Sequence, residues 1–189
     1  MTLDDYREQL RRLAMKADGA GIYNGSNEHA SVVMQVMFEA ATESVEILAN
    51  ELDAEVYGNA DVIRAASTFL SDPDKSLDIL IERDLSAAEI AAHPFLKVMR
   101  RFPNVELRHV VTERQSDYEF NAAVVDVKSM RFEPRRSSPQ AIVAFGRSDD
   151  ATVLHDVFKD LFENSSEEIV WQQDDHLQNA PDPEPIPAE

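Results

Sequence analysis

The sequence of 189 residues contains no cysteine and a single tryptophan. The lack of cysteine excludes disulfide bonds, thiolate metal sites and a cysteine nucleophile, and it fits a reducing compartment. No apolar run approaches the roughly 18 residues that a membrane-spanning helix needs. The first residues, 1–5, lack the basic and then apolar pattern of a secretory signal. We therefore expect a cytoplasmic protein without a membrane span.

Basic side chains are also scarce. There are 18 Lys and Arg against 36 Asp and Glu, which gives a formal net charge of −18. Because each phosphate contact needs a local cation, so acidic a surface disfavours non-specific binding to nucleic acid. Residues 164–189 contain no Lys or Arg, and residues 180–189 alternate proline with acidic residues. This composition predicts a disordered tail over 166–189. The alternative is a nucleic-acid mimic or a docking peptide for a basic partner.

What the sequence does contain is an alternation of helix-like and strand-like segments. Residues 3–17 have one apolar face and predict a helix, which we assign to an N-terminal extension over 1–19. Residues 21–27 have the composition of a polar loop, and residues 20–165 then form one domain. Helices are expected at 28–43, 61–70 and 86–102 (interrupted at Pro94), and strands at 45–49, 77–81, 105–111, 119–127, 130–132 and 140–146.

A last helix follows these segments, with an apolar stripe at helical spacing. Strands separated by helices of ten or more residues indicate βαβ units. The predicted fold class is therefore α/β, with a mainly parallel (mixed) sheet flanked by helices and an antiparallel closing pair. The stripe consists of Val153, Leu154, Val157, Phe158, Leu161 and Phe162.

The segment Tyr118-Glu-Phe-Asn-Ala-Ala-Val-Val-Asp126 is an apolar strand that ends in a lone Asp. Together with the order of elements over residues 28–163, it resembles one lobe of the phospholipase D-like superfamily. That family has the pattern His-x-Lys-(x)4-Asp here, in which His is the nucleophile, Lys holds the phosphate, and Asp orients and tunes. In this sequence the His position is Glu119, the Lys position is Asn121, and Asp126 is retained.

The two departures from the family pattern argue against the family's chemistry. Glu119 is anionic and would repel a phosphodiester, and Asn121 supplies no positive charge to a transition state. The family also uses two facing motifs, whereas this chain has at most one, so an active form would need a homodimer. The resemblance thus implies a catalytically degenerate lobe that serves as a binding or assembly module. Small stand-alone lobes of this kind occur in bacterial operons beside nucleases or defence genes.

The basic residues that do occur are concentrated after the motif, at Lys128, Arg131, Arg135, Arg136 and Arg147. Arginine forks suit phosphate or carboxylate groups, so this segment predicts a contact with an anion or with an acidic partner. The alternative is a solvated loop whose charges pair with the abundant acidic residues.

Two histidines are candidates for chemistry. His29 lies at a loop-to-helix junction, where backbone N–H groups can bind an anion, and His109 lies near the end of a strand, where open α/β sheets place ligands. His155 and His176 have the pattern of surface residues. No His or Cys spacing matches a metal site, and no nucleotide-binding loop is present, so we expect neither a metal nor a cofactor.

These observations favour a non-catalytic binding or assembly module that has a protein partner or forms a homodimer, accessory to a nucleic-acid-processing or defence system. The alternative is a phosphodiesterase or nuclease with a rearranged site that uses His29 or His109.

Overall fold

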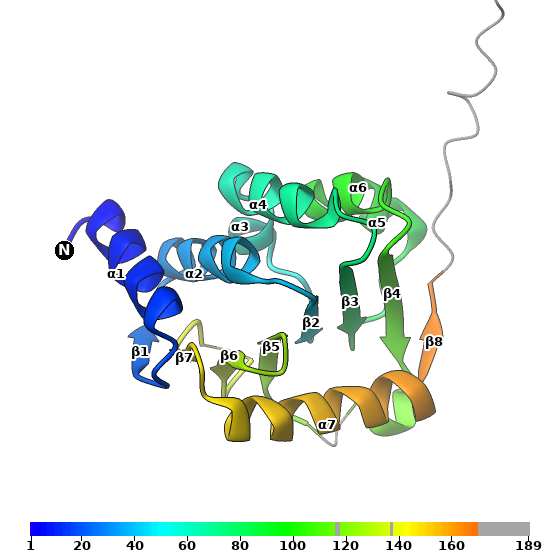
Figure 1. Ribbon diagram of the computed structural model, residues 1–189. Helices are drawn as coiled ribbons and strands as arrows, with labels where there is room; N and C mark the ends of the chain where they lie inside the picture. Colours follow the sequence, from blue (N-terminus) through cyan, green and yellow to red (C-terminus); the bar gives the residue numbers. More distant parts are fainter. Residues whose placement is uncertain (116–117, 137, 170–189) are drawn as a thin grey trace, which may run out of the picture.

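The computed structural model describes residues 1–115, 118–136 and 138–169. An open sheet forms the middle layer, in the strand order β1-β7-β6-β5-β2-β3-β4-β8. Helices α1 to α6 cover one face of this sheet, and α7 covers the other (Figure 1). The predicted α/β class, with a mixed sheet flanked by helices, is confirmed. The expectation of a mainly parallel sheet was wrong, because only two of the seven strand pairs in the described residues are parallel.

The elements follow the apolar periodicity of the sequence. The helices are α1 Leu3–Lys16, α2 Asn27–Ala40, α3 Ala54–Tyr57, α4 Ala60–Leu70, α5 Ala87–Ala92, α6 Pro94–Met99 and α7 Ser148–Asn164, with a 3-10 turn at Thr112–Arg114. The strands are β1 Gly21–Asn24, β2 Ser44–Ala49, β3 Ser76–Ile81, β4 Val105–Val110, β5 Asn121–Val125, β6 Ser129–Glu133, β7 Ala141–Ala144 and β8 Ser166–Glu168.

Parallel pairing is found at the centre of the sheet, where β2 pairs with β3 and β3 pairs with β4. The chain returns between these strands through α4 and then through α5 and α6, as parallel neighbours require. The other pairs, including β2 with β5 and the hairpins β5–β6 and β6–β7, are antiparallel. The β2, β3 and β4 strands therefore all end at one edge of the sheet.

The two faces of the sheet bury separate apolar clusters. The larger one packs α2, α4 and α6 onto the sheet, with Phe38, Phe69 and Phe95 in contact. On the other face, Phe158 and Leu161 of α7 pack against Leu80. Burial at roughly 25 cal/mol per Å² makes these clusters the main stabilising contribution. The predicted α7 stripe is correct apart from Val153, which is exposed.

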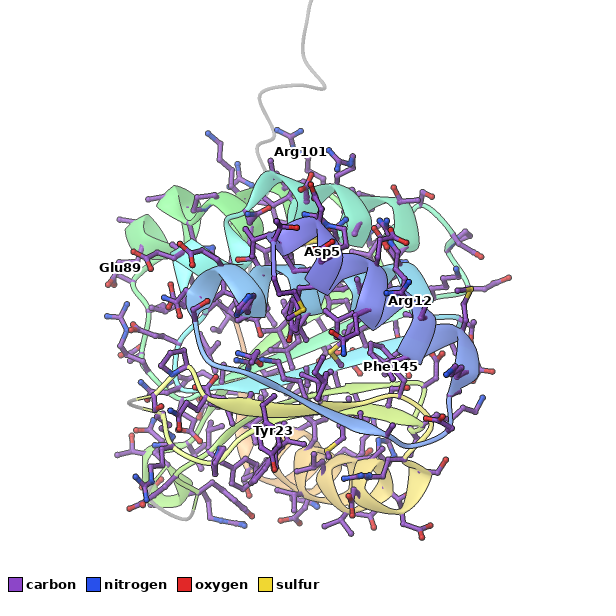
Figure 2. The ribbon with its side chains drawn as sticks, turned by 90° about the vertical axis from the view of Figure 1, so that its left-hand side faces the viewer. Asp5, Arg12, Tyr23, Glu89, Arg101 and Phe145 are labelled. Atoms are coloured by element: carbon purple, nitrogen blue, oxygen red, sulfur yellow. The ribbon has the colours of Figure 1, made fainter. Side chains whose placement is uncertain are left out.

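The first residues are integrated into the domain more closely than an extension would be. Thr2 and Asp5 form a capping box that starts α1, and Tyr6 and Leu10 are buried against α2. The prediction of a loop over 21–27 was wrong in its first half, because Gly21–Asn24 form the edge strand β1. Figure 2 looks onto this edge and shows Tyr23, which is exposed.

The sheet also continues past residue 165, where we expected the domain to end. Ser166–Glu168 form β8, which pairs with β4, and Ile169 packs against the larger cluster. The predicted acidic tail otherwise lies outside the described residues, as do Trp171 and His176. Within the described residues, no helix is both long and apolar enough to cross a membrane.

Candidate functional site

A cavity of about 1070 Å³ opens at the edge where β2 ends. Its walls come from the residues after β2, from the start of β5, from β6, and from the first turns of α2 and α3. Open α/β sheets place their ligands at this edge, outside the carboxyl ends of the parallel strands. The position of the cavity therefore makes it the candidate site.

Three polar side chains of β5 and β6 form a hydrogen-bonded group on the cavity wall. Arg131 and Glu133 are two residues apart on β6, so both side chains point to the same face of the sheet. Arg131 Nη2 lies 2.6 Å from Glu133 Oε2, and Asn121 Nδ2 donates to Glu133 Oε1 at 2.7 Å. Arg131 and Glu133 are 6% and 7% exposed. This group is a buried ion pair with one amide attached.

Asn121 occupies the position of the family's lysine, and both halves of its amide are already used. Its Nδ2 donates to Glu133, and its Oδ1 accepts a hydrogen bond from the backbone N–H of Asn50 at 2.9 Å. The amide joins the start of β5 to the end of β2. The position thus carries a neutral structural bridge, with a carboxylate beside it.

The other two positions of the family pattern lie away from the cavity. Glu119, at the His position, precedes β5 and is exposed. Asp126 lies in the turn at the opposite end of β5, where its carboxylate accepts hydrogen bonds from Thr42 N, Thr42 Oγ1, Glu43 N and Ser44 N at 2.8–3.0 Å. The three positions therefore do not converge, and Asp126 holds the α2–β2 connection.

These contacts also act on the ionisation of Asp126. Burial by itself would raise the pKa of this carboxyl group. The hydrogen bonds donated by Ser44, Glu43 and Thr42 outweigh burial and lower the pKa below its ordinary 3.8. Asp126 is thus held as a carboxylate by backbone N–H groups, which is the environment of a structural cap.

The basic residues predicted as one anion or partner contact are separated in space. Arg131 and Arg136 line the cavity. Lys128 lies in the β5–β6 turn with Asp126, at the other end of the strand, and Arg135 is exposed. Arg147 precedes α7, donates to Gly19 O and pairs with Asp150.

Arg136 connects the loop after β6 to the residue that follows β3. Its guanidinium group pairs with Glu82, which is 2% exposed, and donates to the carbonyl oxygen of Tyr118. Burial raises the pKa of Glu82, and the Arg136 charge opposes that shift. The positive charge of Arg136 is therefore compensated by Glu82 within the protein.

The two predicted histidines lie outside the cavity wall. The ring of His29 packs on Tyr6, with 4.4 Å between ring centroids. His109 Nε2 contacts Glu82 O at 3.1 Å and Gln115 Nε2 at 3.3 Å. Among the described residues, no histidine lines the cavity.

His155 was expected at the surface, and the structure places it against the sheet instead. Its Nδ1 lies 2.9 Å from the carboxylate of Glu46, which is 4% exposed and belongs to β2. His155 belongs to α7, so the pair joins α7 to β2. Helix α7 covers the face of the sheet opposite α2 (Figure 1).

Sequence reasoning did not find the acidic wall of the cavity. Asp53 caps α3 by accepting from Glu55 N at 2.8 Å, and Asn27 Nδ2 donates to both Asp53 and Glu55. The available signal was Asp53-x-Glu55 in the segment that follows the buried parallel strand β2, since such positions lie at the ligand-binding edge. No group of three or more His, Asp or Glu in the described ranges could hold a metal ion.

Residues 26–172 match a protein family described as "Domain of unknown function (DUF7931)". The chain belongs to this family. The match covers most of this chain and includes every cavity-lining residue except Leu3, Arg7 and Gly25. No curated protein has a significantly similar sequence.

Solved structures with the same fold have very different sequences. NucT from Helicobacter pylori is 11% identical, with a TM-score of 0.57, and the match covers 80% of this chain and all of NucT. Phosphatidylserine synthase of Haemophilus influenzae Rd KW20 is 10% identical, with a TM-score of 0.52, over 79% of this chain and 39% of the synthase. Both support the phospholipase D-like fold.

A further similar structure is TrmBL2, described as an archaeal chromatin protein with a novel mode of DNA binding. It is 12% identical, with a TM-score of 0.57, over 88% of this chain. The DUF7931 chain spans 61% of the length of TrmBL2, so it corresponds to part of that protein. At these identities the comparisons establish the fold.

Proposed function

We propose that this chain is a non-catalytic phospholipase D-like binding module, accessory to a nucleic-acid-processing or defence system. One observation carries the proposal. The cavity at the family's active-site edge has no histidine among its described lining residues, and Asn121 with Glu133 stands where the family uses a lysine. A phosphohistidine mechanism needs both a His nucleophile and a cation for the transferred phosphoryl group.

The charges around the cavity support the same proposal. The three arginines on its walls pair with carboxylates: Arg7 with Asp4 and Asp61, Arg131 with Glu133, and Arg136 with Glu82. A phosphodiester entering the cavity would have to displace these pairs and approach the Glu133 carboxylate, which is costly in a partly desolvated site. Lys128 and Arg135 are exposed and form no ion pair with another described residue, so they can contact an acidic surface of a partner.

The link to nucleic acid rests on analogy of fold. TrmBL2, described as a chromatin protein that binds DNA, shares this fold, and a lobe without chemistry can contribute to such an assembly by binding. The partner on this proposal is another protein or a second copy of the chain.

Hydrolysis assays test the absence of catalysis. We expect the purified chain to release no p-nitrophenol from bis(p-nitrophenyl) phosphate above buffer, and to leave labelled single-stranded DNA intact, while an enzyme with the complete family motif cleaves both under the same conditions. Hydrolysis that persists in a chelator and is lost in His109→Ala or His29→Ala would instead establish a rearranged nuclease site.

A capture experiment tests the binding role. The tagged chain is purified from its native host with and without nuclease treatment, and co-purifying proteins are identified by mass spectrometry. We expect a stoichiometric protein partner that survives nuclease treatment. A paired charge reversal, Lys128→Glu with Arg135→Glu, should weaken its recovery, whereas recovery of the chain alone would contradict the proposal.

A further inference from the structure

The walls of the cavity carry more negative than positive charge. Six acidic residues line it, against three arginines that are already paired as described above. Glu51 and Asp61 are also paired, with Arg83 and Arg64. Among the described residues, three lining acids have no ion-pair partner: Glu28, Asp53 and Glu55.

Two of these acids are brought together by a neutral group. Asn27 Nδ2 donates to Asp53 Oδ2 at 3.1 Å and to Glu55 Oε2 at 2.8 Å. Both carboxylate oxygens thus lie within hydrogen-bond distance of one nitrogen atom, so they lie close to each other. Two carboxylates so placed repel each other, and an amide does not compensate their charge. The arrangement has the geometry of a binding site for a planar cation with several N–H donors.

A second observation points into the same cavity. Tyr57, on α3, lines the cavity and is 7% exposed, and no described residue forms a hydrogen bond with its hydroxyl. The hydroxyl oxygen is not among the buried polar atoms that lack a partner, so it faces the open space of the cavity, where a ligand can reach it. Burial raises the pKa of Tyr57 to about 12, so the neutral hydroxyl is available both to accept and to donate.

We propose that the cavity binds an arginine side chain of a partner protein, with its guanidinium group between Asp53 and Glu55 and within reach of Tyr57. The inference rests on the proposed binding function and names the chemistry of the partner. A guanidinium group presents five N–H donors in a fixed plane and is weakly hydrated, so it satisfies two carboxylates and a hydroxyl together.

The same observations argue against other occupants. A bare metal ion is disfavoured because no cluster of three or more ligating residues is found in the part of the chain that the structure describes. A nucleic-acid phosphate would face uncompensated carboxylates. The volume of about 1070 Å³ exceeds that of one side chain, so a flanking segment of peptide backbone fits as well.

The test uses the full chain and a peptide pair that differs in charge alone. The probe is acetyl-Gly-Arg-Gly-amide, and the control replaces arginine by citrulline, which keeps the shape and removes the charge. Binding is followed by NMR, through the backbone amides of α2 and α3 and the side-chain amide of Asn27. We expect saturable shifts at these groups with the arginine peptide alone, and weaker binding at high salt.

Matched variants locate the site. Asp53→Asn keeps an oxygen that can cap α3, and Glu55→Gln keeps the side-chain length, so both should fold, as circular dichroism would verify. Each single variant should weaken peptide binding about three- to fivefold, because partly exposed charge pairs contribute modestly. The double variant should weaken it about tenfold or more. Tyr57→Phe should also weaken binding. Glu163→Gln removes one exposed charge from α7 and should change nothing.

The outcomes separate this inference from the proposed function. Equal binding of the citrulline peptide, or unchanged binding in the Asp53/Glu55 pair, would overturn the arginine site. Shifts at the same groups with inorganic phosphate, and none with the arginine peptide, would overturn it too. In each case, if the double variant Asp53→Asn with Glu55→Gln captures a protein partner as well as the wild type does, the proposed binding function is retained. Phosphodiester hydrolysis by the chain would instead overturn the proposed binding function.

Discussion

At the end of β5 the carboxylate of Asp126 accepts four hydrogen bonds from one short segment, residues 42–44, whereas at its start Asn121 joins a buried ion pair that lines a cavity. The first region is a closed arrangement in which the carboxylate is fully used. Among the described residues, the second region has the Tyr57 hydroxyl without a hydrogen bond and the acids Asp53 and Glu55 without an ion pair. The two regions lie on one strand and show the difference between a structural and a binding use of polar side chains.

The comparison also explains which part of the family pattern persists. Asp126 is useful without any chemistry, because it fixes the connection from α2 to β2. Glu119, at the His position, is exposed, and Asn121, at the Lys position, bridges β5 and β2 through its own amide. On the proposed function, which includes no phosphoryl transfer, the His and Lys positions can hold Glu119 and Asn121 while Asp126 is kept.

The largest effect is expected at the cavity end. Arg131→Met leaves Glu133 as a buried carboxylate without its cation, and removing one member of a buried pair costs about 3–5 kcal/mol of stability. Urea unfolding followed by circular dichroism measures the change. In the double variant Arg131→Met with Glu133→Met, no unpaired charge is left buried at this position, and we expect most of the lost stability to return.

An equal loss in the single and double variants would contradict this account. The ion pair would then stabilise the protein through the packing of its side chains rather than through its charge. The polar side chains at the cavity end of β5 would then have a structural role, as Asp126 has at the turn end.

The next effect is at the turn. Asp126→Asn replaces a carboxylate that accepts from three backbone N–H groups and one hydroxyl, and we expect a loss of about 2 kcal/mol at pH 7, since hydrogen bonds to charged groups are the stronger ones. Folding lowers the pKa of Asp126 from 3.8, so its stabilisation is present above pH 3.8 and is lost as pH falls through the lowered value.

The difference in unfolding free energy between the wild type and Asp126→Asn should therefore narrow as pH is lowered from 7 to below 3.8. A difference that does not depend on pH would show that Asp126 acts through its size alone. Glu43→Gln, which keeps its backbone N–H, is the matched control and should cost little.

The sequence predicted the frame of the fold more completely than the site. Apolar periodicity identified α7 and the parallel strands, because burial on one or both faces leaves a regular pattern. It missed β1, whose four residues Gly21–Asn24 pair with β7 at the sheet edge through backbone groups that carry no side-chain signal.

The site was harder to predict because it depends on pairings between distant residues. The sequence showed that Arg131 and Arg136 are basic. It did not show that Glu133 and Glu82 compensate their charges in ion pairs. Asp53 was one acid among 36, and its proximity to Asn27 exists only after α2 and α3 have packed. Only tertiary structure distinguishes such residues from a solvated surface.

A smaller effect is expected from the amide that connects the two strands at the cavity. Asn121→Ala leaves the backbone N–H of Asn50 without its side-chain acceptor and removes one donor to Glu133. We expect a loss of about 1.5 kcal/mol, because one neutral hydrogen bond and one donor to the Glu133 carboxylate are lost while Glu133 keeps its ion pair with Arg131. Asn121→Asp is the informative companion. It restores the acceptor for Asn50 but places a second carboxylate beside Glu133, so it should be less stable than Asn121→Ala at pH 7 and should recover as pH falls.

The smallest effect is expected beside Asp126, and it has the opposite sign. Val127 has a φ of 51°, a left-handed conformation that a β-branched residue adopts at a cost. Val127→Gly removes that cost of roughly 1–2 kcal/mol but gives the unfolded chain more freedom, so we expect a net gain of about 0.5 kcal/mol. Val127→Ala keeps a Cβ atom and should gain less. If both variants lower the midpoint of urea unfolding, then Val127 packs usefully in the turn, and the stability of that end of β5 depends on more than the carboxylate of Asp126.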